Sequence, residues 1–271
     1  MKGRHFRAIF ISDVHLGTSD CQATYLVDFL ENNSADKLYL VGDIIDLLAM
    51  KKRIQLTPAH EIVIGLILEW VKKGCQVCYI PGNHDAYFRR FCGQSIAGVD
   101  VRLNADYESQ EYGTILVSHG DEFDSIMHSR GWLIWLGDVS HGALIRINTL
   151  VNILRKSLNL PYWSMAHAVK KRIGKAKEFI TRFETIASKR ASEKRYDGYI
   201  CGHIHHWQMR YYGDALYMND GDWVEHCSAL VETEQGEWQL LHWSDHEEIL
   251  ASSKQLIKPI GQTELGDCLA S

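Results

Sequence analysis

Ile9-Phe10-Ile11-Ser12-Asp13-Val14-His15 is the stretch on which the interpretation of this chain depends. Its apolar, β-forming start predicts a buried strand over residues 7–13, and that strand ends in Asp-x-His. A carboxylate and an imidazole two residues apart, where a strand gives way to a loop, can bind one metal ion. Because Asp-x-His is frequent by chance, the prediction needs support from the rest of the chain.

The segments that follow predict alternating strands and helices. A helix is expected at 23–31, a strand at 37–41, a second helix from Pro58 to Gly74, and a strand at 76–80. This β-α-β-α-β order predicts an α/β fold with a parallel sheet wrapped by helices. In open sheets of this kind, ligands bind beyond the carboxyl ends of the strands.

Further metal-ligand residues stand at the carboxyl ends of four later strands. Any single histidine could instead have a purely structural role. Five strand ends that all carry such residues argue together against that explanation. Oxygen and nitrogen donors without sulfur suit Mn, Fe, Zn or Co. The predicted metal ligands are Asp13, His15, Asp43, Asn83, His119, His203 and His205.

The second half of the chain changes pattern twice. From about residue 122 to 196 strand patterns are scarce, and two apolar stripes at helical spacing, 144–158 and 169–187, predict a helical hairpin. The tail after Asp245 is polar and is expected to be partly loose. The remaining strands are expected at 99–103, 107–111, 114–118, 198–201, 208–212, 215–219, 228–232 and 238–243.

Composition indicates a globular protein of ordinary type, with 46% hydrophobic and 23% charged residues in 271. A net charge of −5 argues against general binding of polyanions. Residues 125–196 nevertheless carry 14 Lys/Arg against 4 Asp/Glu, whereas the remainder carries 15 against 30. A solvated helix face and a surface for an anionic ligand are both compatible with this segment. Seven cysteines and no secretory signal predict a reducing cytoplasm.

In this order and on these elements, Asp-x-His, Gly-Asp, Gly-Asn-His-Asp, His-Gly and Gly-His-x-His resemble the calcineurin-like metallophosphoesterase superfamily. The resemblance implies an α+β sandwich, a β-sandwich flanked by helices, in a single domain over 1–271 with a helical cap insertion at about 122–196. It also implies two divalent metals. Asp13, His15 and His205 would hold the first, Asn83, His119 and His203 the second, and Asp43 would bridge them.

The catalytic residues implied are His84, facing the phosphate, and Asp85, holding His84. A metal pair about 3.5–4 Å apart lowers the pKa of a shared water, and the resulting hydroxide would attack phosphorus in line. His84 would stabilise the developing charge or protonate the leaving oxygen. Manganese is the expected metal, with Fe, Zn or Co as alternatives.

Within the superfamily, the chain is most similar to the UDP-2,3-diacylglucosamine diphosphatases of lipid A synthesis and their paralogues. The resemblance implies a phosphorylated small-molecule or lipid-linked substrate and an insertion that forms a lid over acyl chains. An apolar trough with cations also suits a membrane-surface helix, which predicts association with the inner face of the inner membrane. The alternative for the Trp residues is packing inside the hairpin. The predicted substrate-binding residues are Asp121, Trp132, Trp135, Arg155 and Lys171.

The chain departs from that diphosphatase pattern around the substrate. It has His84 where the diphosphatases usually have Arg, and the runs after Asp43 and His205 also differ. A paralogue acting on another phospholipid-like or nucleotide-sugar substrate is therefore an alternative, and a nuclease or a non-catalytic scaffold is a weaker one. No nucleic-acid partner is expected, because the positive charge is confined to one insertion. The oligomeric state is left open.

Overall fold

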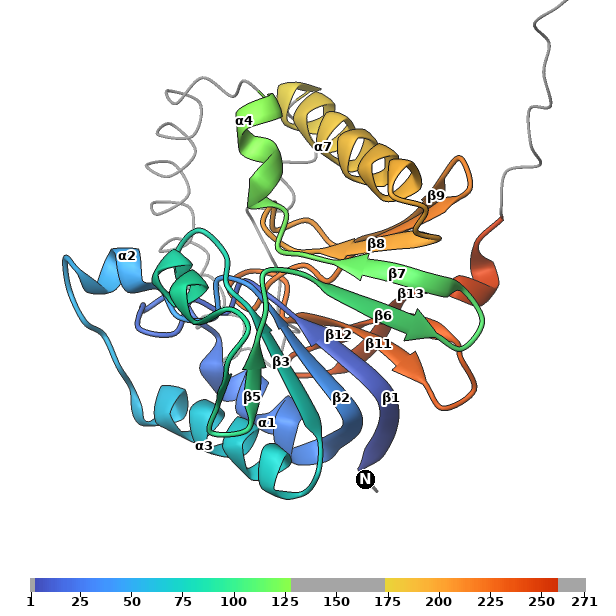
Figure 1. Ribbon diagram of the computed structural model, residues 1–271. Coiled ribbons are helices and arrows are strands. Elements are labelled where there is room, and N and C mark those ends of the chain that lie inside the picture. Colours follow the sequence, from blue (N-terminus) through green and yellow to red (C-terminus); the bar gives the residue numbers. More distant parts are fainter. Residues whose placement is uncertain (1–2, 128–173, 258–271) are drawn as a thin grey trace, which may run out of the picture.

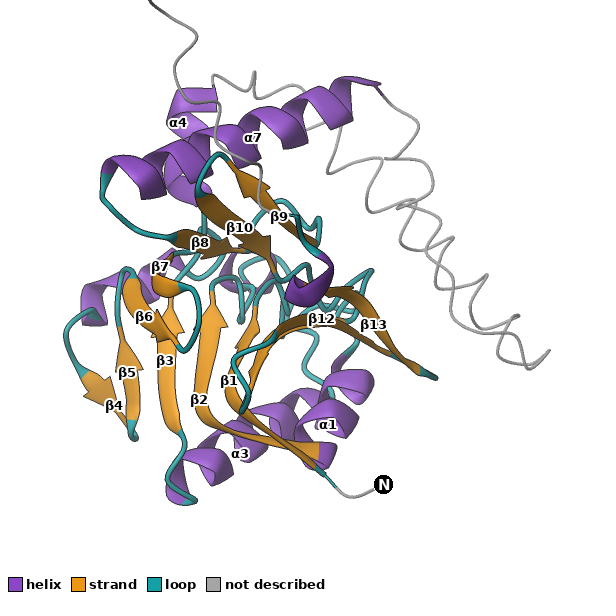
Figure 2. Ribbon diagram, turned by 90° about the vertical axis from the view of Figure 1, so that its right-hand side faces the viewer, coloured by secondary structure: helices purple, strands orange, loops and turns teal. Residues whose placement is uncertain are grey.

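The computed structural model describes residues 3–127 and 174–257, and its described elements form four layers (Figures 1 and 2). Two β-sheets face each other, and helices cover the outer face of each sheet. This arrangement confirms the predicted α/β class and the sandwich flanked by helices.

The first sheet has eight strands in the order β13-β12-β11-β1-β2-β3-β5-β4. Its centre is parallel, as the β-α-β-α-β order predicts, and consists of β1 (Arg4–Ile11), β2 (Asn33–Val41), β3 (Gln76–Ile80) and β5 (Val99–Val101). Antiparallel strands extend it on both sides: β4 (Ser95–Ile96), β11 (Ser228–Thr233), β12 (Trp238–Trp243) and β13 (Glu247–Ser252).

The second sheet has five strands in the order β6-β7-β8-β10-β9. Its three inner strands are parallel, namely β7 (Gly113–Val117), β8 (Gly198–Cys201) and β10 (Ala215–Asn219). The edges are antiparallel, with β6 (Ala105–Ser109) beside β7 and β9 (Gln208–Tyr212) beside β10. Most of these bounds lie within two residues of the expected ones.

Two helices, α1 (Ala23–Asn32) and α3 (Pro58–Lys72), pack on the outer face of the first sheet. The α3 helix has Pro at its first position and a capping box formed by Thr57 and His60, so its start satisfies backbone donors locally. A long helix, α7 (Gly174–Glu193), covers the second sheet. The short helices are α2 (Leu47–Met50), η1 (Ala86–Phe91), η2 (Asp121–Phe123), α4 (Asp124–Met127) and η3 (Ser253–Gln255).

The central strand β1 is buried on both faces, which explains its continuous apolar run. Alternate side chains point to opposite sides of a strand. Ile9 and Ile11 therefore join the core beneath the helices, while Phe10 joins the core between the sheets. There its ring stacks on Tyr39 with centroids 4.7 Å apart and meets Tyr107 edge-on at 5.2 Å. These contacts anchor β1 between the two sheets, two residues before Ser12.

The tail after Asp245, expected to be partly loose, begins with a strand that was not among the expected ones. Residues Glu247–Ser252 form the edge strand β13, which pairs with β12. Its exposed Glu247 and Glu248 gave the segment a polar composition, but charged side chains are common on edge strands, where they discourage further pairing.

The expected insertion is described only at its two ends. At the C-terminal end, α7 buries Phe183, Ala187 and Ala191 against the second sheet, so this part is a layer of the fold. Its role as a lid stays a prediction, since Trp132, Trp135, Arg155 and Lys171 lie outside the described residues. Within the described residues, no helix combines the length and the apolar character needed to cross a bilayer.

Candidate metal centre

Five loops meet where parallel strands of both sheets end. They follow β1, β2 and β3 in the first sheet and β7 and β8 in the second. Backbone hydrogen bonds tie neighbouring loops together. The N–H of Asp13 donates to Gly42 O at 3.0 Å, that of His15 to Asp43 O at 2.9 Å, and that of Gly202 to His119 O at 3.2 Å. The loops that carry the predicted ligands therefore form one connected edge.

Asp13, His15 and His205 place one ligand atom each within 4.8 Å of one another. The Nε2 atom of His205 lies 3.1 Å from Oδ1 of Asp13, and Nε2 of His15 lies 3.9 Å from the same oxygen. Oδ1 of Asp13 and Nε2 of His15 are buried and have no hydrogen-bond partner among the described residues. Buried polar atoms are normally paired, so two such donor atoms facing one point fit a metal ion.

Asp13, Asp43 and His119 form a second group of the same kind, which shares Asp13 with the first. The Nδ1 atom of His119 donates to Val41 O at 2.9 Å, so Nε2 is left as the ligand nitrogen. That Nε2 lies 3.4 Å from Oδ2 of Asp43 and 3.3 Å from Oδ1 of Asn83. Asp43 thus belongs to the second group, which is joined to the first through Asp13.

His203 lies beside this second group. Its ring centroid is 5.1 Å from that of His119, and its Nε2 atom lies 2.9 Å from Oδ1 of Asp124. A metal bound by His203 would therefore use Nδ1. Asp124, at the start of α4, was not among the predicted site residues.

The electrostatics of the centre favour a cation. Burial disfavours ionised Asp43, but the neighbouring His119 and His15 outweigh this cost and lower its pKa. Burial likewise disfavours the charged imidazole of His15, but the hydrogen bond to Asp46 and the charge of Asp43 raise its pKa to about 9. Carboxylates that hold their charge while binding protonated imidazoles will exchange those protons for divalent metal. The donor set and the unpaired donor atoms indicate binding of divalent metal.

The backbone of the site is strained. Non-glycine residues rarely adopt positive φ, and when several do so together they commonly belong to a functional site. Five of the seven predicted ligands have φ between 48° and 67°, namely Asp13, His15, Asp43, His203 and His205. The surrounding loops hold these residues in the orientation that brings their side chains together.

Two glycines of the motifs lie against the ligands. A Cβ atom on Gly82 would stand 2.3 Å from Oδ1 of Asp43 and 2.6 Å from Nε2 of His119. A Cβ atom on Gly202 would stand 2.0 Å from Oγ of Ser12. Only glycine permits the strand-end backbone to approach so closely. This explains the glycine at the start of the Gly-Asn-His-Asp and Gly-His-x-His motifs.

The expected partner of His84 is different in the structure. Nδ1 of His84 lies 3.0 Å from Oδ1 of Asp46, so Asp46, and not Asp85, is the carboxylate beside this imidazole. Asp85 is buried and accepts from the N–H of Gly82 at 2.6 Å and from the N–H of Ile44 at 2.9 Å. The side chains of the neighbouring residues His84 and Asp85 point in different directions. Asp85 therefore joins the loops that follow β2 and β3, and no hydrogen bond links its side chain to that of His84.

Asp46 also contacts the predicted metal ligand His15. Its Oδ2 atom lies 2.9 Å from Nδ1 of His15, while Oδ1 accepts from the N–H of Ala49 at 2.7 Å and thereby caps α2. Asp46 thus orients a metal ligand and a predicted catalytic residue at once. A second aspartate three residues after Asp43, just past a strand end, was the sequence signal that could have identified it.

Asp121, predicted to bind substrate, lies beside a cation. Its Oδ2 atom accepts from Nη2 of Arg89 at 2.6 Å, and the side chain of Arg89 is 36% exposed. Arg89 belongs to η1, which follows His84 and Asp85. Arg89 was not among the predicted site residues, although it follows His84 by only five residues.

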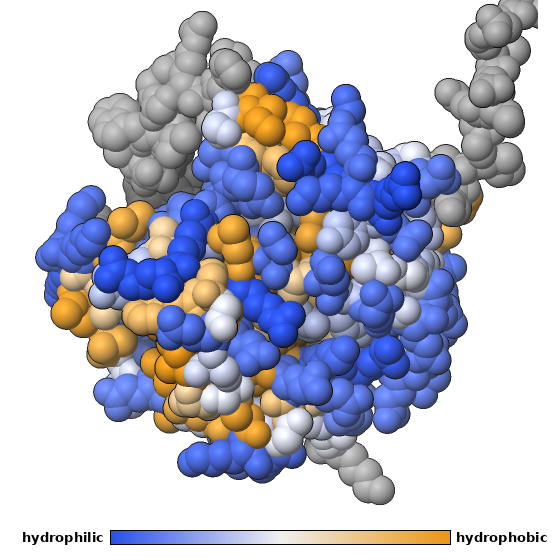
Figure 3. All heavy atoms as spheres, in the orientation of Figure 1, coloured by the Kyte–Doolittle hydropathy of each residue, from blue (hydrophilic) through white to orange (hydrophobic). Residues whose placement is uncertain are grey.

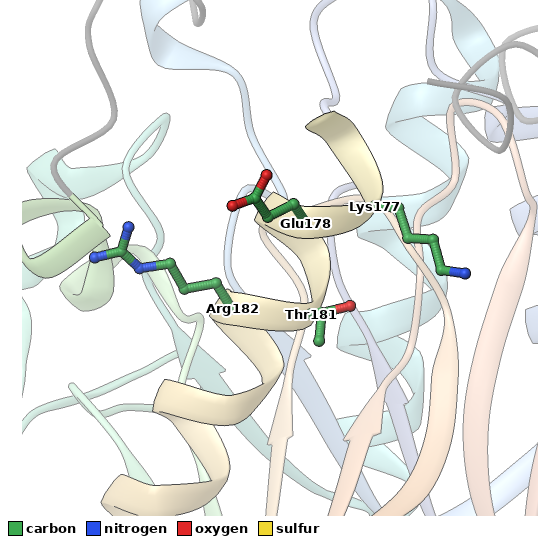
Figure 4. Close-up of a pocket in the computed structure, with 4 residues that line it drawn as sticks. All are labelled: Lys177, Glu178, Thr181 and Arg182. Atoms are coloured by element: carbon green, nitrogen blue, oxygen red, sulfur yellow. The ribbon is translucent and has the colours of Figure 1, made fainter. Parts of the chain in front are cut away.

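A hollow on the described surface lies along α7 and is lined by Lys177, Glu178, Thr181 and Arg182 (Figure 4). All four residues come from one helix, and none is a predicted metal ligand. The hollow therefore belongs to the basic part of the insertion, and it supplies no ligand to the metal centre.

Comparison with known proteins assigns the family. Residues 6–207 match the family model for the calcineurin-like phosphoesterases. No curated protein matches the chain closely enough in sequence to be called a relative.

Solved structures with a similar arrangement are remote in sequence. Vacuolar protein sorting 29 of Cryptosporidium parvum is 12% identical with a TM-score of 0.46, covering 91% of this chain and 95% of its own. The phosphoesterase Yfce of E. coli is 14% identical with a TM-score of 0.45, covering 90% and 97%. A dimetal phosphatase of Danio rerio is 13% identical with a TM-score of 0.39, covering 91% and 98%. Similarity this remote carries no argument about activity.

The family match covers every motif from Asp13 to His205, and it includes the five loops that converge in the structure. The chain is therefore a hydrolase of phosphate esters, and it belongs to the calcineurin-like phosphoesterase family.

Proposed function

We propose that this protein uses two divalent cations to hydrolyse a phosphodiester or pyrophosphate bond, and that the cation is manganese. The observation that carries the proposal is the position of Asp43. Its Oδ2 atom faces His119, and Asp43 lies in the same ligand group as Asp13. Asp13 in turn belongs to the first ligand group, so Asp43 is near both groups. Carboxylates placed between two clusters of nitrogen and oxygen donors are typical of two-metal sites.

When bound, the metal pair would polarise the phosphoryl group and supply a nucleophile at neutral pH. The protein's own residues would hold and orient the reactants. His84 stands beside the centre, with Nε2 4.0 Å from Oδ2 of Asp43 and a side chain that is 33% exposed. It can therefore reach both the metal edge and a substrate that arrives from solvent. Held by Asp46, it would donate a proton or a hydrogen bond to a phosphoryl oxygen.

The substrate is proposed on narrower grounds. The His119-Gly120-Asp121 motif and the basic insertion resemble the diphosphatases that act on UDP-diacylglucosamine. The ion pair of Asp121 with Arg89 supports a polar subsite beside the metals, suited to a sugar or a phosphate group. A lipid-linked nucleotide sugar is therefore the first candidate, and association with a membrane surface through the insertion is part of the same proposal.

The test is a turnover panel with purified protein and Mn²⁺. It compares UDP-diacylglucosamine with an unacylated nucleotide sugar, a simple aromatic phosphodiester and a cyclic nucleotide. Asp43→Asn, which keeps the size of the side chain but removes its charge, is the inactive reference. The same panel is repeated with Zn²⁺, Co²⁺ and Fe²⁺ to identify the metal.

Hydrolysis of the acylated substrate at least about ten times faster than of the unacylated one, a difference of about 1.4 kcal/mol, would support the lipid-linked assignment. Equal rates would remove the acyl chain from recognition and favour a soluble nucleotide sugar. Absence of metal-dependent turnover on every substrate, with metal bound, would overturn the proposed chemistry.

A further inference from the structure

Ser12 lies between two buried carboxyl groups that are far apart in the sequence. Its Oγ atom lies 2.5 Å from Oδ2 of Asp13 and 2.7 Å from Oδ1 of Asp220. All three residues are at most 1% exposed. Asp220 follows the end of β10 in the second sheet and lies outside every motif that identified the metal site.

The number of protons limits how these three groups can interact. A serine hydroxyl has one proton and can donate it to one acceptor at a time. If both carboxyl groups were ionised, one of the two short contacts would join two oxygen atoms with no proton between them. One of the carboxyl groups therefore carries a proton that it donates to Ser12.

Asp13 has the surroundings of the ionised member. Its Oδ2 atom accepts from the N–H of His203 at 2.8 Å, and its Oδ1 atom lies 3.1 Å from Nε2 of His205. These neighbours stabilise a negative charge on Asp13, and a carboxyl group must be ionised to bind a metal ion.

Asp220 has the surroundings of a neutral acid. Its Oδ2 atom is buried and has no hydrogen-bond partner among the described residues. A bare oxygen of this kind is costly on a carboxylate and much less so on the carbonyl of a carboxylic acid. Burial raises the pKa of Asp220 well above its ordinary value, against the opposing effect of the Ser12 hydroxyl.

We propose that Asp220 is a positioning residue for the metal centre, acting as a neutral carboxylic acid. Its proton goes to Oγ of Ser12, and the proton of Ser12 goes to Oδ2 of Asp13. With the N–H of His203, this occupies Oδ2 twice and leaves Oδ1 as the ligand atom. The relay thus fixes which oxygen of Asp13 faces the metal. The inference rests on the proposed two-metal function.

Asp220→Asn tests the proposal because its amide can donate to Ser12 as the neutral acid does, without a charge. Manganese affinity, measured by titration calorimetry, is expected to stay within about threefold of the parent protein. Asp220→Ala removes the donor and is expected to weaken metal binding by about 10–100-fold, the usual effect of losing a group that orients a ligand. A tenfold loss in Asp220→Asn would show that Asp220 supplies a charge, and would overturn the proposal.

The double variant Ser12→Ala/Asp220→Ala tests whether the two residues act as one relay. The relay predicts that the double variant binds manganese no more weakly than the worse single variant, because groups in one network are not additive. Additive losses would contradict it. Ser228→Ala is the matched control, since Oγ of Ser228 donates to the backbone O of Asp220 at 2.7 Å and takes no part in the side-chain relay. It is expected to leave metal affinity unchanged.

Infrared difference spectroscopy gives a readout that requires neither metal nor turnover. The spectrum of the metal-free parent protein minus that of Asp220→Asn is expected to show the carbonyl band of one protonated carboxyl group, because other buried carboxyl groups such as Glu184 contribute equally to both spectra. An identical spectrum in both would overturn the protonated state of Asp220, even if the protein proved to bind no metal. Failure of the relay and failure of the proposed hydrolase function are therefore separable.

Discussion

The imidazole of His119 is joined to the backbone carbonyl of Val41 by a hydrogen bond of 2.9 Å. Val41 is the last residue of β2, and His119 follows the end of β7 in the other sheet. The bond therefore links the two sheets at the metal edge. It also selects the tautomer in which Nε2 carries the free electron pair that a metal requires.

His119→Gln is expected to reduce the bound manganese from two ions per chain towards one, since the chain loses the ring nitrogen that faces Asp43 and Asn83. Metal content after gel filtration, measured by mass spectrometry, checks this result. His5→Gln is the matched control, because His5 is a histidine of the surface whose ring contacts Ser34 and Asp36. Two bound ions in His119→Gln would exclude this residue from the ligand set.

His84→Ala is expected to retain both metals and to lose about 10²–10⁴ in kcat, the usual contribution of a general acid or of a group that stabilises developing charge. The imidazole is not among the predicted ligands, so metal content should match that of the parent protein. Steady-state kinetics together with metal analysis separate the two effects. Unchanged kcat would remove His84 from the mechanism.

Asp46→Ala should differ from His84→Ala, because Asp46 contacts both His15 and His84. It is expected to weaken metal binding by about 10–100-fold through His15 and to lower kcat at saturating metal through His84. Asp85→Asn provides the comparison and should mainly reduce stability, since Asp85 accepts backbone donors from two loops. If Asp46→Ala kept full affinity and rate, Asp46 would have no orienting role.

Gly82→Ala is expected to abolish metal binding while the fold persists. The added methyl group would overlap Oδ1 of Asp43 and Nε2 of His119, and both side chains are buried and cannot move away freely. Gly65→Ala is the control, because Gly65 lies inside α3 with nothing within 4 Å of the added atom. That change should stabilise the protein by up to about 1 kcal/mol, as expected for alanine in a helix. Normal metal content in Gly82→Ala would contradict the geometry of the site.

The metal-free protein is expected to lose stability as the pH rises from about 7 to 9. The folded pKa of His15 is raised to about 9, above its ordinary value of 6.5, so its contribution is complete below pH 6.5 and is lost as the pH passes 9. Burial raises the pKa of Glu184 to about 7, so most of its ionisation takes place near or below the lower end of this pH range. Thermal unfolding at several pH values checks the trend.

Excess manganese should flatten that alkaline decline, because a metal ligand has no proton to lose. His15→Gln should also be flatter than the parent protein in the metal-free state. A parent protein whose melting temperature stays constant between pH 7 and 9 without metal would contradict the shifted pKa of His15.

Local patterns in the sequence are enough to locate the strand ends and the residues that occupy them. Apolar runs such as Ile9–Ile11 are local patterns, and burial on both faces follows from their continuity. Because the carboxyl ends of parallel strands lie at one edge, the predicted ligands Asp13 and Asp43 could be placed together without coordinates. The polar composition after Asp245 did not indicate β13, because that strand forms by pairing with β12.

Which side chains face one another within that edge depends on how the loops fold in three dimensions. His84 is followed directly by Asp85, yet it lies against Asp46, and Asp13 is linked through Ser12 to Asp220, which is 208 residues from Ser12. The direction of a side chain at a strand end depends on loop backbone angles, here with φ of 49° at Asp13 and 52° at Asp43. Packing between the sheets imposes those angles, and no local pattern in the sequence records them.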